Sequence, residues 1–263
     1  MIRFFSVSFL FLLFLSCATN NSFKIDELNG TQDSDLDGIS PVPSNTTPQP
    51  LINNMFKSFT DDPVFMSELK AIMTLDPYFW VFVDKYRQLD ENYSPDDLIE
   101  LENGVFLINK EKLFLRKEAA ESLKAMASAA RAEGVILLIS SAYRSYSYQE
   151  QIYPQLVKEM GQEEADRVSA RPGHSQHQLG LAIDFGSISN TFASSPQGLW
   201  VAANASRFGW SLSYPEDCEN ITGHSWESWH YRYVGIQIAL FIDKYFNGIQ
   251  HNALMFLNEY SKS

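Results

Sequence analysis

The chain has 263 residues, and 45% of them are hydrophobic, which suffices for one well-filled core and hardly for two. Its 20 basic and 32 acidic side chains give a formal net charge of -12. An acidic chain without a basic stripe argues against nucleic acid as a partner. We therefore expect one acidic globular body with a solvated surface.

The N-terminus has the pattern of a lipoprotein-type signal peptide over residues 1–16. One basic residue precedes a mainly apolar run at 4–15, which suits a signal-peptide core and is too short to span a bilayer. The Leu-Ser-Cys ending at 15–17 resembles a bacterial lipoprotein cleavage box, and a processed Cys17 would carry the lipid. The alternative is an ordinary secretory signal with an incidental cysteine. We expect an extracytoplasmic protein, in the periplasm or cell envelope, with a lipid anchor in a bacterial membrane.

Residues 17–50 are rich in Asn, Asp, Ser, Thr and Pro, and we expect them to form a flexible tether. Within them, residues 33–38 match the start of a calcium loop. The twelfth position would be Ser44 instead of the glutamate that such loops need, so a linker is the better interpretation. A lipidated Cys17 would leave Cys218 without a partner for an intrachain disulfide.

The globular pattern begins near residue 51, and its clearest helix lies at 115–134. There Leu123, Met126 and Ala130 recur at the helical period, and Gly134 follows where a C-terminal cap belongs. In chain order the predicted elements are a helix and a possible strand near Phe82 within 67–89, a turn at 92–95, the helix at 115–134, a buried strand at 135–141, a mostly helical stretch at 146–170 interrupted near Pro154 or Gly161, a strand at 179–186, a helix at 195–209, a strand at 229–234 and a helix at 236–246.

Helices precede, separate and follow the short strands in this pattern. We therefore predict a single α+β domain over residues 51–263, in which helices flank a small antiparallel sheet. No internal repeat is visible.

Two histidines and two carboxylates have the chemistry of a zinc hydrolase. Such an enzyme needs three protein ligands, an open position for water and a nearby base. His177 and Asp184 are close in the sequence, and His230 follows three residues after Glu227. We expect the first three to bind one zinc ion and Glu227 to act beside it as a proton shuttle. Spacing alone does not distinguish this set from surface or satisfied core polar groups.

Three segments make the pattern more specific. "SAYRSYSYQ", "PGHSQHQLGLAIDFG" and "WESWHYRYVG" together resemble the VanY-like D-alanyl-D-alanine carboxypeptidases of the LAS group of zinc peptidases. Those proteins carry Ser-x-x-Arg-Ser, then Ser-x-His-x-x-Gly-x-Ala-x-Asp, then Glu-x-Trp-His-x-Arg. All three motifs occur here in order, and the resemblance covers about residues 75–245.

The resemblance implies that metal-activated water removes the C-terminal D-alanine from peptidoglycan stem peptides. It assigns His177, Asp184 and His230 to the zinc ion and Glu227 to the catalytic base. An L,D-carboxypeptidase or an endopeptidase on the same scaffold stays open. A non-catalytic wall-binding lipoprotein is disfavoured, because all four residues are present. His174 lies outside the ligand motif, so we expect it no closer to the metal than the cleft rim or a ligand's neighbour.

The same resemblance implies that Arg144, Gln149 and Ser175 bind the substrate. A guanidinium suits a terminal carboxylate or a scissile carbonyl. Arg144 could instead be a structural ion-pair partner, Gln149 a helix-surface residue and Ser175 a loop cap. The chain also departs from the family, with Gln176 where glutamate is usual and Ser213 where arginine is common. These departures bear on the shape and charge of the pocket, and hence on which peptide is cut.

Overall fold

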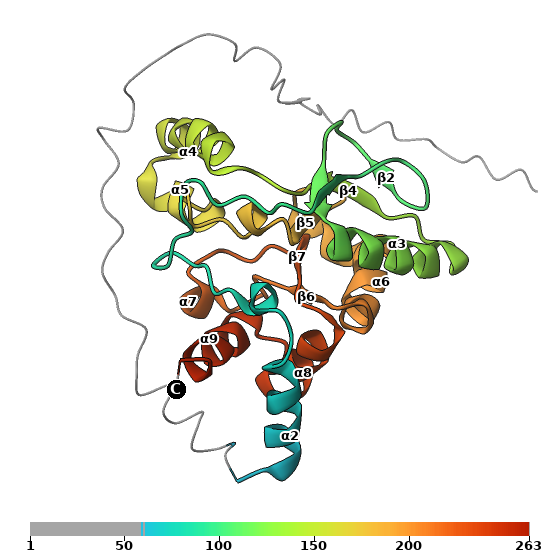
Figure 1. Cartoon of the computed structure of the whole chain (residues 1–263). Coiled ribbons are helices and arrows are strands. Elements are labelled where there is room, and N and C mark those ends of the chain that lie inside the picture. Colours follow the sequence, from blue (N-terminus) through green and yellow to red (C-terminus); the bar gives the residue numbers. More distant parts are fainter. Residues whose placement is uncertain (1–58, 60, 263) are drawn as a thin grey trace, which may run out of the picture. The chain divides into compact units, whose positions relative to one another are not determined.

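The computed structural model describes residue 59 and residues 61–262 (Figure 1). The predicted signal peptide at 1–16, the lipidation of Cys17 and the tether at 17–50 lie outside the described residues and stay predictions. The elements follow in the order α2 (Pro63–Ile72), β1 (Leu98–Glu100), β2 (Leu107–Ile108), β3 (Phe114–Arg116), α3 (Lys117–Ala132), β4 (Leu138–Ser141), α4 (Tyr146–Met160), α5 (Gln162–Val168), β5 (Ala182–Phe185), α6 (Pro196–Asn204), β6 (Trp210–Leu212), α7 (Glu219–Thr222), β7 (His230–Tyr233), α8 (Ile236–Phe246) and α9 (Gln250–Tyr260). Within the described ranges, no helix is both long and apolar enough to cross a bilayer.

The central sheet has five strands in the order β2-β4-β5-β7-β6. Its pairs are antiparallel except for β2 and β4, which run parallel. The chain passes through β3 and α3 between these two strands, and a parallel pair needs such a long connection. Strands β1 and β3 form a separate antiparallel pair. The predicted α+β domain with a small, mainly antiparallel sheet is confirmed.

Helix α3 covers the sheet with the apolar stripe that the sequence predicts (Figure 1). Leu123, Met126 and Ala130 are fully buried, and Gly134 follows the helix with a φ of 79°. A left-handed backbone favours glycine at that position. The helical stretch after β4 breaks at Gly161, whereas Pro154 lies inside α4. Gly161 has a φ of 82°, which an α-helix cannot contain.

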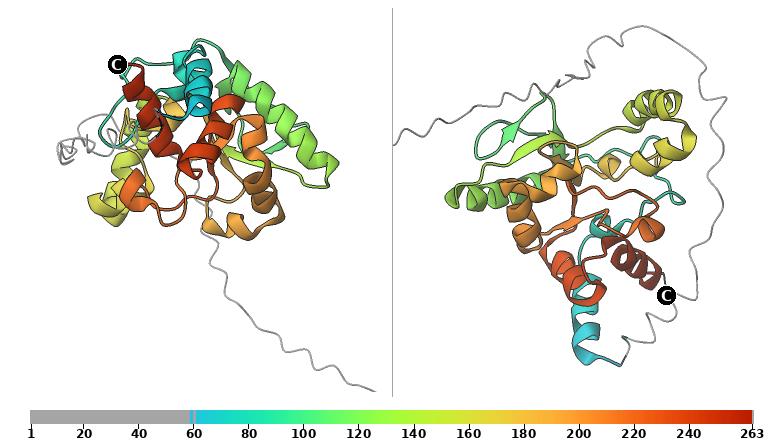
Figure 2. Two further views of the ribbon diagram at one scale, coloured as in Figure 1. Left: turned by 90° about the horizontal axis from the view of Figure 1, so that it is seen from below. Right: turned by 180° about the vertical axis from the view of Figure 1, so that it is seen from behind.

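Helices α2, α8 and α9 pack against one another through aromatic side chains (Figure 2). The Phe65 ring of α2 lies 5.1 Å from the Phe241 ring of α8 and 5.7 Å from the Phe256 ring of α9, measured between centroids. All three rings are buried. The sequence pattern predicts α8 and misses α9, the helix that follows it. This aromatic cluster anchors α9 to the domain, and the position of α9 matters for the site.

The predicted strand near Phe82 is wrong. Phe82 and Val83 are both buried although they are adjacent, so the segment is covered on both sides without joining the sheet. The Asp84 carboxylate then accepts hydrogen bonds from the backbone N–H groups of Tyr86 and Arg87, at 2.9 and 2.8 Å, and turns the chain. Such a side-chain bond competes with extended structure. Strands β1, β2, β3 and β6 have two or three residues each, too few for a periodic pattern.

Candidate metal centre

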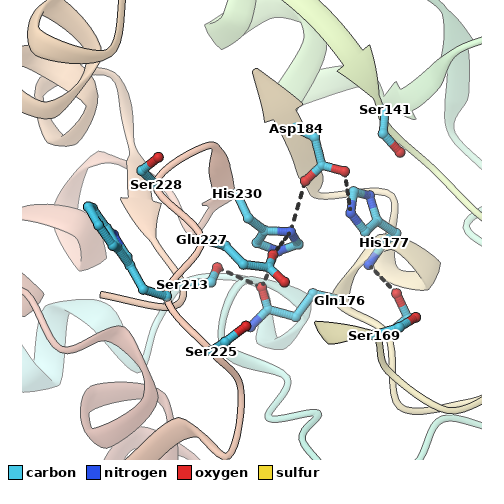
Figure 3. Close-up of polar contacts among 12 residues, drawn as sticks. Ser141, Ser169, Gln176, His177, Asp184, Ser213, Ser225, Glu227, Ser228 and His230 are labelled. Carbon is cyan, nitrogen blue, oxygen red and sulfur yellow. Dashed lines mark hydrogen bonds and ion pairs between the residues drawn. The ribbon is translucent and has the colours of Figure 1, made fainter. Parts of the chain in front are cut away.

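The structure brings His177, Asp184 and His230 together (Figure 3). Asp184 on β5 and His230 on β7 are direct cross-strand partners. His177 lies in a single 3-10 turn, which the Ser175 hydroxyl caps and which ends at Gly180 in the left-handed region. One ligand atom from each of the three residues lies within 4.8 Å of the others, and all three side chains are buried.

The hydrogen bonds of the two imidazoles decide which nitrogen faces the cluster. His177 Nδ1 lies 2.6 Å from the carbonyl oxygen of Ala142, so it donates and leaves the Nε2 lone pair 3.3 Å from Asp184 Oδ2. His230 Nε2 lies 3.2 Å from Gln176 Oε1, so its Nδ1 lone pair faces Asp184 Oδ1 at 3.0 Å. Each histidine is thus held by the nitrogen that points away from the cluster.

The three buried acceptors form a cation site. Burial, with Arg144 beside it, lowers the pKa of His177 to about 4, so this imidazole is neutral. Burial opposes the ionisation of Asp184, yet its pKa lies well below the usual range, and the Arg144 guanidinium donates to its Oδ2 at 2.8 Å. Lone pairs that face one another in a buried site repel unless a cation lies between them. Two imidazole nitrogens and one carboxylate oxygen are a donor set that fits zinc.

Arg144 supplies a positive charge at this cluster. Its Nη2 donates to Asp184 Oδ2 at 2.8 Å and lies 2.9 Å from His177 Nε2. Its Nε donates to the hydroxyl of Ser141 on β4 at 3.0 Å. The side chain is 22% exposed and lines the cleft. Arg144 therefore reaches the predicted ligands directly while it stays open to a bound molecule.

Glu227 lies beside the predicted ligands and not among them. Its Oε2 is 3.6 Å from His230 Nδ1, and the residue is 9% exposed. Burial, followed by the nearby charge of Asp184, raises the pKa of Glu227 to about 8. A carboxyl group with such a pKa can hold and release a proton near neutral pH, which general acid–base catalysis requires.

These groups line a cleft of about 460 Å³. The rest of its wall combines apolar side chains with uncharged polar ones. The apolar lining residues are Ile152, Leu156, Val168, Ala170, Ile188 and Trp229. Asp184 and Glu227 are the acidic residues among the lining side chains of the described chain. The cleft therefore combines a cluster of metal-binding groups with wall residues that suit uncharged parts of a ligand.

Ser175 and Gln149 occupy different places relative to the cleft. Ser175 lines it and also accepts a hydrogen bond from the backbone of His177 at 3.3 Å, so it is both a wall residue and a cap. Gln149 is buried behind the wall, where its Nε2 donates to the Ala170 carbonyl at 2.7 Å and to the Ser169 hydroxyl at 3.2 Å. Ser169 and Ala170 line the cleft, so Gln149 holds part of its wall.

Two further histidines have different positions. His174 points away from the cluster, with its Nδ1 2.7 Å from the carbonyl oxygen of Asp84, and lines a neighbouring cavity of about 170 Å³. His224 and Tyr214 form part of the cleft wall, with ring centroids 4.7 Å apart. The sequence analysis missed both wall residues, because they lie in an irregular segment outside the three motifs.

The free thiol of Cys218 is absent from the cleft lining.

Comparisons with known proteins agree with this geometry. The family model of VanY, D-alanyl-D-alanine carboxypeptidase, matches residues 112–236. The putative carboxypeptidase YodJ of Bacillus subtilis (strain 168) is 34% identical over 217 residues, which are 75% of this chain and 80% of the relative. The matched range contains His177, Asp184, Glu227 and His230.

Two solved structures are also similar. The LdcB LD-carboxypeptidase is 35% identical, with a TM-score of 0.59 over 66% of this chain and 88% of that chain. The vancomycin resistance D,D-pentapeptidase VanY, solved as a mutant in complex with Zn(II), is 30% identical, with a TM-score of 0.57 over 68% of this chain and 99% of that chain. The chain belongs to the VanY family of D-alanyl-D-alanine carboxypeptidases.

Proposed function

We propose that this protein is a zinc-dependent peptidoglycan carboxypeptidase that removes the C-terminal D-alanine from cell-wall stem peptides. The observation that carries the proposal is the cluster of two imidazole lone pairs and one carboxylate, His177, Asp184 and His230, in a cleft. Glu227 beside them supplies the titratable group that hydrolysis needs. The known zinc-bound structure of a VanY relative supports the same choice of metal.

The reaction consumes one water molecule and breaks one peptide bond. A zinc ion held by the three ligands would lower the pKa of a bound water and polarise the scissile carbonyl. Glu227 is placed to take the proton from the attacking water and to pass it to the amine of the departing D-alanine. The water oxygen joins the carbonyl carbon as the carbon–nitrogen bond breaks. A cation near Glu227 favours the ionised carboxylate, which is the form that acts as a base.

Arg144 has a role on the substrate side of this reaction. Its Nη2 shares the His177 Nε2 lone pair in the described structure. One lone pair cannot accept this hydrogen bond and bind a metal ion, so metal binding would leave a guanidinium N–H free for the substrate. That N–H can donate to the terminal carboxylate or to the carbonyl oxygen as negative charge develops on it.

The bond that is cut distinguishes two candidate activities. The apolar residues of the cleft wall suit small uncharged side chains such as those of two consecutive D-alanines, which favours D,D cleavage. The L,D-carboxypeptidase alternative stays, because the LdcB structure is as similar to this chain as the VanY structure is. Muropeptides digested with the protein decide between them by mass spectrometry. Loss of the fifth residue identifies D,D cleavage, and loss of the fourth identifies L,D cleavage.

The catalytic assignment is tested with Glu227→Gln. This variant keeps the shape of the side chain and removes its ability to accept a proton. We expect activity to fall by roughly 10³-fold or more while one zinc ion per chain is still bound. The matched control is Glu216→Gln. Glu216 lies in the same segment between β6 and β7 but is exposed and does not line the cleft, so this variant should keep full activity. Retained turnover in zinc-loaded Glu227→Gln would refute the role of this carboxyl as the base.

We also propose that a lipid on Cys17 anchors the protein outside the cytoplasm of a bacterium. The support is the sequence of residues 1–17 and the tether-like composition up to residue 50. About 33 flexible residues would let the domain reach the wall from a membrane. Cell fractionation of a Cys17→Ala variant tests this: the protein should leave the membrane fraction, and an unchanged distribution would contradict the anchor.

A further inference from the structure

A chain of neutral hydrogen bonds connects the metal centre to helix α9 and begins where Gln176 lies beside His230 and Ser213 (Figure 3). His230 Nε2 lies 3.2 Å from Gln176 Oε1, and Gln176 Nε2 donates to Gln250 Oε1 at 3.3 Å. Gln250 Nε2 then donates to the carbonyl oxygen of Ser211 on β6 at 3.0 Å. Gln176 is 7% exposed and Gln250 is 1% exposed. Water therefore does not compete effectively for these groups.

This chain of bonds has a direction that begins at the backbone. A carbonyl oxygen can only accept, so Ser211 requires the amide nitrogen of Gln250 on its side. The carbonyl oxygen of Gln250 must then face Gln176, which requires the amide nitrogen of Gln176 there. The carbonyl oxygen of Gln176 is left to face His230, and it requires a proton on Nε2. The geometry thus places the Nδ1 lone pair of His230 toward Asp184.

The Ser213 hydroxyl supports the same arrangement. Its Oγ donates to Gln176 Oε1 at 2.7 Å and lies 3.3 Å from Gln250 Oε1, where it can donate as well. A hydroxyl hydrogen beside these two oxygens favours the orientation in which both amide oxygens point to it. A flipped Gln176 would instead place its amide nitrogen beside His230 Nε2.

The opposite tautomer of His230 would oppose metal binding. A proton on Nδ1 would lie between this nitrogen and Asp184 Oδ1, which are 3.0 Å apart, and would form a hydrogen bond there. That bond would occupy both a nitrogen and a carboxylate oxygen of the predicted zinc site. A group outside the cluster that accepts a hydrogen bond from Nε2 would favour the tautomer in which Nδ1 is free to bind a metal ion.

We propose that Gln250 is a positioning residue that, through Gln176, keeps His230 in the tautomer that binds metal. The proposal deepens the zinc peptidase function above and rests on it for its biological meaning. Gln250 begins α9, and residues 250–260 lie beyond the range 112–236 that the family model matches. A helix outside the matched region is therefore part of the metal site, although it contributes no metal ligand.

The test compares two replacements of Gln250 in the full chain. Gln250→Met keeps the length of the side chain and removes both hydrogen bonds. Gln250→Glu keeps an acceptor oxygen for Gln176 in either protonation state. We expect Gln250→Met to raise the zinc dissociation constant about ten-fold, measured by chelator competition, and Gln250→Glu to raise it less. A role in packing alone predicts the reverse order, because methionine is apolar and a buried glutamate is costly.

A second readout needs no metal. In the metal-free protein labelled with nitrogen-15 histidine, the His230 resonances should show a proton on Nε2 in the wild type and in Gln250→Glu. Gln250→Met should show a loss of that tautomer. The signals are assigned from their absence in a His230→Asn spectrum. This measurement still decides the positioning role if the wild-type chain proves to bind no zinc, so the two proposals can fail separately.

Leu257→Ala serves as the matched control on the same helix. Leu257 is fully buried in α9 and takes no part in the amide network, so its truncation loosens the packing of the helix alone. Leu257→Ala should lower thermal stability and leave the His230 tautomer unchanged. The proposal is overturned if Gln250→Met keeps the wild-type tautomer and zinc affinity, or if Leu257→Ala shifts them as much as Gln250→Met does.

Discussion

Acidification should destabilise this protein through His224 in the wall of the cleft. Burial, then the charges of Lys85 and His230, lower the pKa of His224 from 6.5 to about 3. The side chain is 3% exposed, and its Nδ1 has no hydrogen-bond partner in the described structure. Between these two pKa values the unfolded chain binds a proton that the native chain does not bind, so stability falls as the pH drops below 6.5.

The size of this loss follows from the two pKa values. Between pH 7.5 and pH 5.0, linkage gives a loss of about 2 kcal/mol in the free energy of unfolding from His224 alone. Any native pKa below about 4 gives nearly the same loss, because the native imidazole is then neutral throughout this range. His224→Gln replaces the imidazole by a side chain that does not titrate. The variant should therefore lose about 2 kcal/mol less than the wild type over the same interval.

Urea denaturation at both pH values, on metal-free wild type and on His224→Gln, measures this difference. Other buried groups such as His177 and Glu227 also titrate, but they are common to both proteins and cancel in the comparison. The slopes of the denaturation curves should match, which shows that both proteins expose the same surface on unfolding. Equal pH dependence in the two proteins would refute the buried neutral state of His224.

Two further predictions concern binding. His177→Ala should abolish stoichiometric zinc binding in an equilibrium dialysis assay. His174→Ala should keep it, because His174 contacts a backbone carbonyl away from the cluster. Equal zinc content in the two variants would contradict the ligand set. Gln149→Leu should raise KM about ten-fold at unchanged zinc content, because it removes the hydrogen bonds that hold Ser169 and Ala170 in the cleft wall. A change in kcat alone would indicate direct contact with the reacting groups instead.

The metal cluster could be predicted from the sequence because its chemistry is concentrated in short motifs. His177 and Asp184 lie on one turn and the strand that follows it, and Glu227 and His230 lie three residues apart. The pairing of β5 with β7 joins the two pairs, and the sequence predicts both strands, β5 from an apolar run and β7 from alternating aromatic residues. The helical period of α3 likewise shows directly in Leu123, Met126 and Ala130, because local periodicity reports which side of a helix is buried.

The positions of Arg144 and Gln149 relative to the cleft could not be told apart from the sequence, and their substrate-binding roles stay predictions. Their places in the motif indicate proximity to the substrate, and the structure separates them. Arg144 reaches Asp184 and lines the cleft, whereas Gln149 holds the chain behind its wall. A helical pattern does not reveal whether a polar side chain ends in a cleft or at a carbonyl of another segment, because that depends on how α4 packs.

The outer part of the metal site depends on tertiary structure alone. Gln176 and Gln250 are 74 residues apart, and no periodic pattern relates them, so their contact cannot be predicted from the sequence. Their contact exists because the aromatic cluster around Phe65 and Phe256 fixes α9 beside β6. Residue types and short spacings determine which groups can bind a metal ion. Packing between distant elements decides how those groups are oriented, since side-chain orientation follows from partners that the chain brings together only when it folds.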